Sequence, residues 1–329
     1  MGLASQVRCF PSMLELSVVI ATYNRAERLN SCLEALGNQT LASSSFEVVV
    51  VVDGATDGTM QMLGVYSPPF RLRVVWQQNS GQAMALNRGI EEARGLYCLF
   101  LDDDIIVSPE TLAEHLRAQQ SPGDIVAVGQ LTLKLPKNAG WYARAFAEGW
   151  RRHYDALNRG EVGLTWEGCY SGNMSAPRRT LRTCGGFDAG LPRGFDVELA
   201  RRLEEAGCVL RYLRAAAGCQ DERKGFRELS RDAEAAGEVL LNLRASKRVP
   251  CERVLQSYRS GNLLKIRLTR LLLALQTPPR LLAAFGVLIP SRQYQYLYYR
   301  LIHNLCVWRG IRRASRGTGL WTEINGRVS

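Results

Sequence analysis

The chain has 329 residues, of which 46% are hydrophobic and 22% charged, a composition typical of globular proteins and unlike that of disordered or fibrous ones. Because no run of eighteen uncharged apolar residues is present, we expect no membrane-spanning helix, and residues 1–11 lack the apolar core of a secretion signal. The formal net charge of +11 favours anionic partners such as nucleotides, nucleic acid or anionic lipid.

The first 118 residues alternate short apolar runs with segments of helical spacing. Strands are predicted over 16–20, 46–52, 72–76 and 96–101, and helices over 26–36, 59–65, 81–93 and 109–118, the last with Pro109 in its first turn. This alternation predicts an α/β fold with a mostly parallel sheet flanked by helices. Loops 21–25, 53–58 and 102–104 follow strands directly, so we expect them to converge on one crevice at the carboxyl ends of the strands.

The second half is less regular and becomes helical and basic. Predicted there are one or two strands within 125–133, a helix or a loop over 141–158, a Gly-rich segment over 167–177, a helix over 196–206 and a strand over 209–213. Beyond residue 221 the pattern is helical, with breaks at Pro250, Pro278-Pro279 and Pro290. We therefore expect an α/β domain of residues 12–220 and a basic helical region of residues 221–329.

Asp102-Asp103-Asp104, at the end of a strand, is the strongest chemical signal. Alternate side chains of an extended chain share a face, so Asp102 and Asp104 are expected to point one way and Asp103 the other. Adjacent carboxylates in a crevice raise one another's pKa unless a cation compensates. Oxygen ligands of this kind suit Mg²⁺ or Mn²⁺, bound by one or two carboxylates and substrate phosphates. The alternative is an acidic surface turn, although Ser108-Pro109 already offers a cap for the next helix.

Two other strand ends carry groups that suit a nucleotide. Asp53 precedes Gly54, and its carboxylate can accept hydrogen bonds from a base or a ribose, with a simple turn aspartate as the alternative. Thr22 and Tyr23 follow the first strand and offer backbone and hydroxyl contacts to a base. Neither loop is decisive by itself.

In combination these segments resemble glycosyltransferase family 2, the large inverting family with the GT-A fold. The segments are Leu16-Ser-Val-Val-Ile-Ala-Thr-Tyr-Asn-Arg25, Val51-Val-Asp-Gly-Ala-Thr-Asp-Gly-Thr59, Asn79-Ser-Gly-Gln-Ala-Met-Ala-Leu-Asn-Arg-Gly89, Phe100-Leu-Asp-Asp-Asp104, Ser171-Gly-Asn-Met174, Gly185-Gly-Phe-Asp188 and Gly194-Phe-Asp-Val-Glu-Leu199. The resemblance spans roughly residues 15 to 215, and the combination is specific although each segment alone is not.

The resemblance implies a nucleotide-sugar donor, expected to be linked to UDP, and a divalent metal, Mn²⁺ or Mg²⁺. It places Asp102 and Asp103 near the ribose and the sugar, and the metal at Asp104 together with Asp102. The same resemblance implies that Thr22, Tyr23 and Asp53 hold the base and that the chain passes close to the nucleotide at Gly81.

An inverting transfer needs one carboxylate to take the proton of the acceptor hydroxyl. The resemblance implies Asp196 for this general base, at a helix N-terminus, where the ionised form is favoured. From the residues alone, an N-cap aspartate is the alternative. Glu198 is the second candidate for the base, although a role in orienting the site suits it better.

Many members of the family carry a metal-binding His after the last strand, where this chain has Gln220 and Asp221. Either residue is a candidate substitute for that ligand. The three histidines of the chain lie elsewhere, at His115, His153 and His303, and are expected to be at the surface or satisfied internally. The aromatic residues of the acceptor-side segment suit sugar contacts or core packing; they are Trp141, Trp150, Tyr154 and Trp166.

The tail segments 263–275, 281–289 and 294–308 combine Leu, Tyr and Trp with Arg, as do helices that lie in an anionic membrane interface. A helical cap on the α/β domain is the alternative, and no motif supports nucleic-acid binding. The nine cysteines form no Cys-x-x-Cys pair, which indicates the reducing cytosol. We thus expect a cytoplasmic protein, peripheral on the inner face of the cell membrane, with a saccharide or lipid-linked acceptor in envelope polysaccharide synthesis.

Two rival functions stay open. A non-catalytic nucleotide-sugar or membrane-surface binding protein would explain why Phe195 replaces the acid that precedes the family's base and why the metal-binding His is missing. A nucleotidyltransferase would begin with a Gly-rich loop that carries Arg or Lys after the first strand, and residues 21–25 do not match that pattern.

Overall fold

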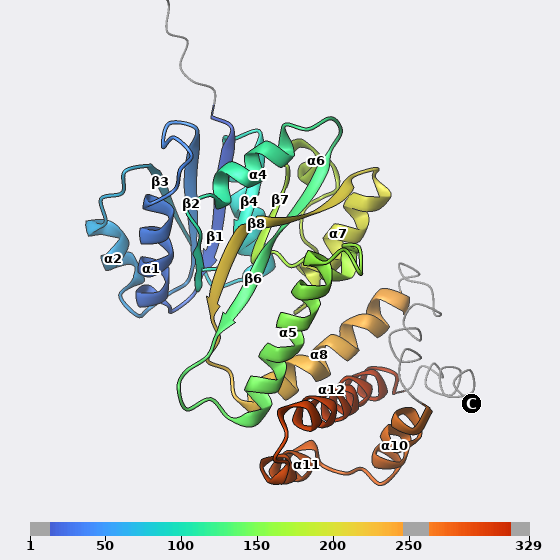
Figure 1. Ribbon diagram of the computed structural model, residues 1–329. Coiled ribbons are helices and arrows are strands. Elements are labelled where there is room, and N and C mark those ends of the chain that lie inside the picture. Colours follow the sequence, from blue (N-terminus) through green and yellow to red (C-terminus); the bar gives the residue numbers. More distant parts are fainter. Residues whose placement is uncertain (1–13, 246–262, 317–329) are drawn as a thin grey trace, which may run out of the picture. The chain divides into compact units, whose positions relative to one another are not determined.

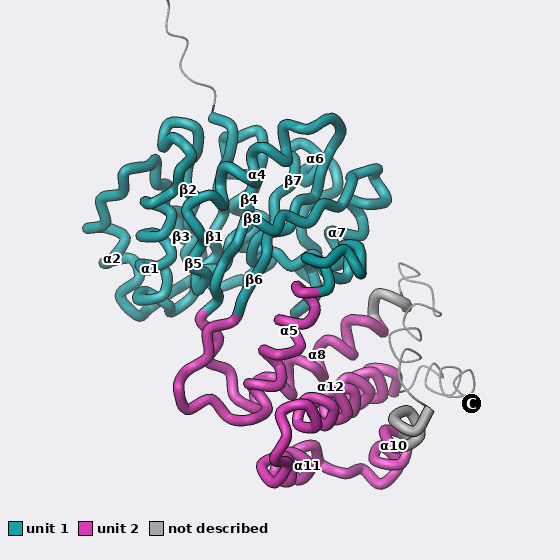
Figure 2. The backbone as a smooth tube through the Cα atoms, in the orientation of Figure 1, with its two compact units in different colours: residues 1–132, 156–220 teal, residues 133–155, 221–329 magenta. Residues whose placement is uncertain are grey.

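The computed structural model describes residues 14–245 and 263–316 (Figure 1). The chain forms two compact units (Figure 2). Unit 1 comprises the residues up to 132 together with 156–220, and unit 2 comprises 133–155 together with the residues from 221 onward. The predicted break at Pro250 lies outside the described residues, as do residues 1–11 and the part of the tail beyond 316.

An eight-stranded sheet, in the order β3-β2-β1-β4-β7-β6-β8-β5, forms the centre of unit 1. Strands β3, β2, β1 and β4 are parallel, whereas β7 runs antiparallel to β4 and β6, and β5 antiparallel to β8. The strands are β1 Leu16–Thr22, β2 Phe46–Asp53, β3 Arg71–Gln77, β4 Tyr97–Leu101, β5 Ile105–Val107, β6 Ile125–Lys134, β7 Asn173–Pro177 and β8 Val209–Asp221. The predicted α/β fold is confirmed, and its second half makes the sheet mixed.

The helices of unit 1 bury the faces that the sequence spacing predicts. On α1, Leu29, Leu33 and Leu36 are buried, and each such leucine contributes about 1.5–3 kcal/mol to stability. All eight residues of β2 are buried, as expected for a strand covered on both faces. The helices are α1 Ala26–Gly37, α2 Thr59–Val65, α3 Gln82–Glu92, α4 Thr111–Gln119, α6 Arg178–Thr183 and α7 Phe195–Glu205, with a 3-10 turn η1 Trp166–Gly168.

Helix α4 begins two residues later than predicted. The Thr111 N–H donates to the Ser108 carbonyl and the Ser108 and Thr111 hydroxyls are 3.1 Å apart, so residues 108–111 form a turn before the helix. Pro109 lies in that turn, where its carbonyl accepts the Thr40 N–H at 2.8 Å. The prediction that Pro109 occupies the first helical turn is therefore wrong.

A buried polar network connects α4 with β7. His115 is fully buried, with Nδ1 2.8 Å from the Ser175 hydroxyl and Nε2 2.9 Å from the Asn173 side-chain oxygen. Burial lowers its pKa to about 4, so the ring is neutral at physiological pH. The expectation of an internally satisfied histidine is confirmed at this position.

Unit 2 is helical. It contains most of α5 Trp141–Asn158, and α8 Phe226–Ala245, α10 Leu263–Ala274, α11 Pro279–Phe285, the 3-10 turn η2 Gly286–Leu288 and α12 Arg292–Ala314. The predicted breaks at Pro278-Pro279 and Pro290 are confirmed. Within residues 14–245 and 263–316, no helix is long and apolar enough to cross a membrane.

Helices α8 and α12 cross closely because a glycine lies at each side of the contact. A Cβ atom on Gly237 would lie 2.1 Å from the Val307 carbonyl oxygen, and one on Gly310 would lie 1.9 Å from the Glu234 carbonyl oxygen. Ion pairs from Arg309 and Arg313 to Glu234, both at 3.2 Å, border the crossing.

Candidate functional site

The strand order places two predicted loops beside each other. The chain passes from β1 to β2 on one side and β4 lies on the other side of β1, which is the position where parallel α/β sheets form a ligand crevice. The register of β1 with β4 pairs Leu16 with Tyr97 and, continued to the strand ends, brings Thr22 opposite Asp103. The Thr22 hydroxyl donates to Asp103 Oδ2 at 2.7 Å.

Asp102, Asp103 and Asp104 form a turn rather than an extended strand end. The Ile105 N–H donates to the Asp102 carbonyl at 3.2 Å and closes the turn. Arg25 Nη1 donates to Asp103 Oδ1 at 2.9 Å and to Asp104 Oδ2 at 3.4 Å. The prediction that Asp102 and Asp104 point one way and Asp103 the other is therefore wrong, because the turn brings Asp103 and Asp104 to one guanidinium.

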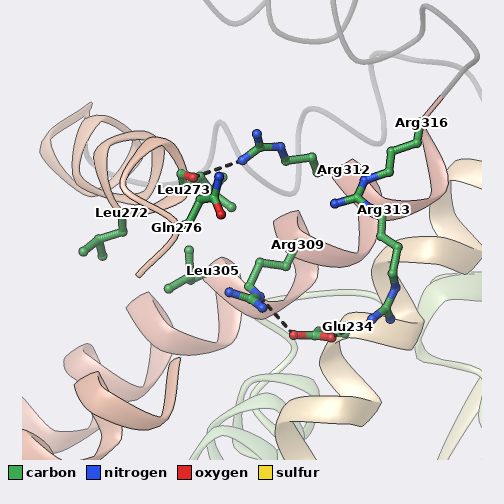
Figure 3. Close-up of a pocket in the computed structure, with 9 residues that line it drawn as sticks. All are labelled: Glu234, Leu272, Leu273, Gln276, Leu305, Arg309, Arg312, Arg313 and Arg316. Atoms are coloured by element: carbon green, nitrogen blue, oxygen red, sulfur yellow. Dashed lines mark hydrogen bonds and ion pairs between the residues drawn. The ribbon is translucent and has the colours of Figure 1, made fainter. Parts of the chain in front are cut away.

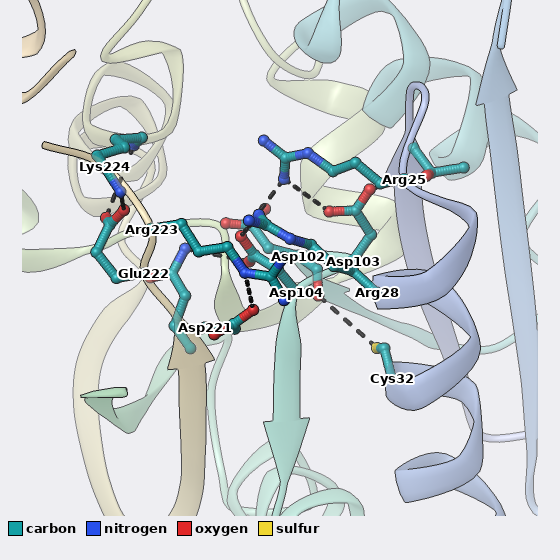
Figure 4. Close-up of polar contacts among 12 residues, drawn as sticks. Arg25, Arg28, Cys32, Asp102, Asp103, Asp104, Asp221, Glu222, Arg223 and Lys224 are labelled. Atoms are coloured by element: carbon teal, nitrogen blue, oxygen red, sulfur yellow. Dashed lines mark hydrogen bonds and ion pairs between the residues drawn. The ribbon is translucent and has the colours of Figure 1, made fainter. Parts of the chain in front are cut away.

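Two arginines offset part of the negative charge, and the sequence interpretation assigned a role to neither. Arg28 Nη1, from the first turn of α1, lies 3.3 Å from Asp104 Oδ2, beside the Arg25 contacts (Figure 4). The i, i+3 spacing of Arg25 and Arg28 at the start of a predicted helix was the available signal, since residues three apart share a face. The neighbouring Cys32 thiol donates to the Asp102 carbonyl.

Asp102 has different neighbours. Its Oδ1 accepts a hydrogen bond from Gln82 Nε2 at 3.2 Å, and a Cβ atom on Gly172 would lie only 2.9 Å from its Oδ2. Burial raises the pKa of Asp102 to about 7, and the charges of Asp104, Asp103 and Asp196 add to this, while Arg25 opposes it. Gly172 is thus needed for the close approach of the chain to this carboxylate.

Asp196 lies on the other side of the same short segment. Its Oδ2 accepts the Ser171 N–H at 3.3 Å and its Oδ1 accepts the Val197 N–H at 2.9 Å, while the Gly172 carbonyl accepts the Asp102 N–H at 3.3 Å. Residues 171–172 therefore bridge the two aspartates that the sequence analysis assigned to the metal and to the base.

The surroundings of Asp196 differ from an ordinary N-cap. The N-cap of α7 is Gly194, and Asp196 lies within the first turn. Burial raises the pKa of Asp196, and the backbone hydrogen bonds from Val197 and Ser171 only partly oppose this effect. The helix position alone predicted a favoured ionised form, so burial has the larger effect.

Glu198 has a structural role. It is fully buried, and Arg202 Nε donates to both of its carboxylate oxygens at 2.8 and 2.9 Å. The same guanidinium donates to the Gly186 carbonyl at 2.7 Å and to the Cys184 carbonyl. Glu198 therefore fixes Arg202 against the loop after α6, in line with an orienting role rather than proton transfer.

Asp53 organises the loop that leads into α3. Its Oδ1 accepts Gln77 Nε2 and the Ser80 N–H, both at 2.8 Å, and its Oδ2 accepts the Gly81 N–H at 2.9 Å. Gly81 has φ +91°, and nothing lies within 4 Å of the position of a Cβ atom. The carboxylate thus shapes the backbone at Gly81, and the space beside that backbone is open.

Two further predicted residues border the crevice. Tyr23 follows Thr22 and exposes 49% of its surface, so its ring is accessible to a ligand. Gln220 lies opposite Ile105 in the β5–β8 pair, and its Nε2 donates to Asp104 Oδ1 at 3.2 Å. Strand β8 extends beyond the predicted 209–213 to Asp221, so this side chain reaches the acidic turn from within the last strand, although it is an amide and not an imidazole.

The acidic turn suits a divalent cation that also binds a ligand. Among residues 14–245 and 263–316, no three His, Cys, Asp or Glu side chains form a metal cage. Magnesium-type sites often use only one or two carboxylates together with substrate phosphates. Asp102 is half-buried, and three neighbouring carboxylates add to the rise in its pKa while Arg25 opposes it. Asp102 and Asp104 therefore offer carboxylate oxygens of the type that such a cation would use.

The aromatic residues of the acceptor-side segment pack within their own units. In unit 2, the Trp141 ring stacks on Tyr298 at 5.9 Å between centroids, and its Nε1 donates to the Ala283 carbonyl at 3.0 Å. Trp150 lies against Tyr154, which is buried. In unit 1, Trp166 is also buried. Core packing accounts for these contacts.

Known proteins share this sequence pattern. The family described as "Glycosyl transferase family 2" matches residues 17–184. The chain is similar to Glycosyltransferase AglE of Haloferax volcanii, at 26% identity over 242 residues, which cover 73% of this chain and 77% of that protein. It is also similar to validoxylamine A glucosyltransferase of Streptomyces hygroscopicus, at 30% identity over 231 residues, 62% of this chain. The match covers 55% of that enzyme, so the chain spans about half of its length.

A solved glycosyltransferase structure is similar to this chain in fold. A mannosyltransferase from Pyrobaculum calidifontis, solved in complex with GDP-Man and Mn²⁺, superposes with a TM-score of 0.58 at 18% identity, over 92% of this chain and 88% of that one. The mixed sheet flanked by helices, with a helical C-terminal region, is thus the GT-A fold that the sequence resemblance implied.

Proposed function

The chain belongs to glycosyl transferase family 2 and is a glycosyltransferase. We propose that it transfers a sugar from a nucleoside diphosphate, expected to be uridine-based, to a hydroxyl group of a saccharide or lipid-linked acceptor. We propose further that the transfer inverts the anomeric carbon, with Asp196 as general base and a divalent cation at Asp102 and Asp104.

The observation that carries this proposal is the bridge formed by residues 171–172. Ser171 binds the Asp196 carboxylate through its N–H and Gly172 lies against the Asp102 carboxylate, so the base and the proposed cation site are fixed by one short segment. An inverting transfer needs this proximity, because the acceptor hydroxyl must attack while the diphosphate departs from the opposite face of the sugar.

The residues of the crevice have separate roles in the proposal. Asp196 takes the proton of the acceptor hydroxyl, and its raised pKa makes it a stronger base near neutral pH. Asp102 and Asp104 hold the cation, which when bound would neutralise the charge of the departing diphosphate. Arg25 fixes Asp103 and Asp104. The nucleobase of the donor is placed beside Tyr23 and the Gly81 backbone.

Donor binding with and without metal tests the cation site. We expect UDP-sugars to bind in the presence of Mn²⁺ and weakly in the presence of a chelator, and Asp104→Asn to lose the difference between the two conditions. Isothermal titration calorimetry with a panel of nucleoside diphosphate sugars measures both. The matched control is Glu110→Gln, which removes an exposed acid just before α4 and should bind like the wild type.

The same titration, together with an assay of donor turnover, distinguishes the rival functions. Donor binding that is equally strong in chelator and in Mn²⁺ would contradict a cation at Asp104. Metal-dependent donor binding without any turnover of the donor would favour the non-catalytic binding protein.

A further inference from the structure

We propose that unit 2 docks on the surface of an anionic lipid bilayer through the apolar residues of α10, α11 and η2, with a lipid phosphate received by an arginine-lined cavity between α10 and α12. The observations that carry this proposal are the concentration of exposed apolar side chains, the charge of the same segment, and the composition of the cavity.

The exposed apolar side chains are concentrated in one short stretch. Six side chains between residues 271 and 288 each expose more than half of their surface, up to 76% for Leu288. In the described part of unit 1, large apolar side chains that expose more than half of their surface occur only at three separate places, Val65, Trp76 and Val209. The six, called the apolar patch below, are Leu271, Leu275, Leu281, Phe285, Val287 and Leu288.

Water-exposed apolar groups at this density indicate a binding surface. Leu271 lies in the last turn of α10 and Leu275 directly follows the helix, where its N–H donates to the Leu271 carbonyl at 2.9 Å. Leu281 and Phe285 are four residues apart on α11 and share one face of it. Val287 and Leu288 continue the series in η2 directly after α11. The patch thus extends over consecutive elements of unit 2 that follow one another without a gap in the described chain.

The charge of the segment indicates which kind of surface covers the patch. Residues 263–316 contain ten Lys and Arg and no Asp or Glu. Arg280, in the first turn of α11, and Arg292, the first residue of α12, are exposed. A helix that combines apolar side chains with cationic ones binds an anionic bilayer both by burying apolar surface and by electrostatic attraction. A second copy of this basic segment would be repelled.

A cavity of about 220 Å³ lies beside the patch, between the end of α10 and the second half of α12 (Figure 3). Four arginines line it, Arg309, Arg312, Arg313 and Arg316, and Leu272 and Leu273 of α10 form its apolar wall. Glu234 also lines it and pairs with Arg309 and Arg313, and Glu238 pairs with Arg313. Among the described residues that line the cavity or pair with its arginines, there are thus four guanidinium groups and two carboxylates.

The contacts in the cavity show how the arginines are held. Arg312 Nη1 donates to the Leu273 carbonyl at 3.0 Å, so this guanidinium is fixed at the C-terminal end of α10, next to the residues of the apolar patch. Arg316 is exposed at the rim. Guanidinium groups suit phosphate oxygens because they present several parallel donors. A lipid phosphate in this cavity would lie beside Leu272 and Leu273 of α10.

Vesicle flotation with the full chain tests the proposal independently of the catalytic assignment, since every residue involved belongs to unit 2. We expect the wild type to float with vesicles of phosphatidylcholine and phosphatidylglycerol, to bind pure phosphatidylcholine weakly, and to be released at high salt. The double variant Phe285→Ser/Leu288→Ser should lower the partition coefficient by about tenfold or more. Arg316→Gln should lower it by about fivefold.

Matched controls remove one exposed side chain of the same kind from unit 1. Val65→Ser and Arg94→Gln change residues that are exposed on α2 and before β4, and both should partition like the wild type. Circular dichroism of each variant checks that its helices are intact, which is expected because the substituted side chains are exposed.

Three results would overturn the proposal. The first is a wild type that ignores anionic vesicles or binds neutral vesicles equally well. The second is full displacement from vesicles by inorganic phosphate at constant ionic strength, which would identify a free-anion site. The third is a stable dimer in sedimentation velocity that Phe285→Ser/Leu288→Ser dissociates, which would assign the patch to a second copy of the chain.

Discussion

Asp196 and Glu198 lie two residues apart on α7 and have opposite surroundings. Glu198 is fully buried and paired with Arg202, whereas the Asp196 carboxylate accepts hydrogen bonds from the backbone N–H groups of Ser171 and Val197. A carboxylate that is neutralised by a guanidinium is a poor proton acceptor, and one that is desolvated without a cationic partner is a better one. The sequence placed both acids on one helix, but only the packing distinguishes them.

The difference predicts opposite effects on stability. Glu198→Gln should lower the free energy of unfolding by about 3 kcal/mol, because it leaves the Arg202 guanidinium without its counter-charge. Asp196→Asn should leave the free energy of unfolding unchanged or raise it, because it removes a carboxylate whose ionised form is disfavoured by burial. Urea unfolding of both variants measures this. Equal destabilisation by the two substitutions would contradict the assigned roles.

The acidic turn predicts a pH dependence. A carboxyl whose pKa is higher in the folded than in the unfolded state binds more protons when folded, so stability is lost as the pH rises. The pKa of Asp102 is raised from 3.8 to about 7. In chelator, the free energy of unfolding should therefore decrease from about pH 4 to about pH 7 through this group.

Urea unfolding in chelator at a series of pH values measures the effect, with Asp102→Asn as the reference. The wild type should lose stability relative to this variant as the pH rises, and Mn²⁺ should restore it above pH 7. A difference between the two proteins that is constant over the whole range would contradict the raised pKa.

At the scale of elements, the sequence predicted those with a strong local pattern. The parallel strands β1 to β4 and helices α1 to α3 are continuous apolar runs or have clear helical spacing, and all were predicted. Strand β5 was missed because it has three residues, Ile105–Val107, directly after the acidic turn. Strand β7 was missed because it lies in a Gly-rich segment and pairs antiparallel with β4 over a long sequence separation.

The sequence predicts those site residues that lie at the ends of strands. It does not predict contacts that depend on the pairing of strands far apart in the sequence, such as β4 with β7. Thr22 and Asp53 are the last residues of their strands and Asp102 to Asp104 follow β4, and the parallel sheet brings these strand ends to one side. The bridge between Asp102 and Asp196 depends on residues 171–172, which precede β7, so a prediction without β7 has no means to find it. Arg25 and Arg28 were missed for a similar reason, because their partners are remote in sequence.

The crossing of α8 and α12 gives a prediction at this scale. Gly310→Ala places a methyl group in contact with the Glu234 carbonyl, so it should lower the free energy of unfolding by about 1–3 kcal/mol. The control is Gly64→Ala in α2, where nothing lies within 4 Å of the new methyl group and where alanine favours the helix by up to about 1 kcal/mol. Thermal unfolding followed by circular dichroism measures both; a fully stable Gly310→Ala would contradict the close crossing.

At the scale of the whole molecule, the chain comprises two units with different physical characters. Unit 1 carries the sheet with the acidic crevice, and unit 2 carries the basic helices with the apolar patch. The association of α5 with the C-terminal helices within unit 2 depends on contacts such as Tyr142 with Tyr299, whose ring centroids are 4.9 Å apart. Local periodicity contains no information about such a contact, because the two residues are 157 positions apart in the sequence.

The stereochemistry of donor hydrolysis tests the central proposal most directly. Proton NMR of the first sugar released from an α-linked nucleoside diphosphate donor, with Mn²⁺ and with water as acceptor, should show the β-anomer before mutarotation. Asp196→Asn should reduce the rate by about 10²- to 10⁴-fold, the usual contribution of a general base, while donor binding in the same buffer stays unchanged. First release of the α-anomer, or a variant as fast as the wild type, would contradict an inverting transfer with Asp196 as base.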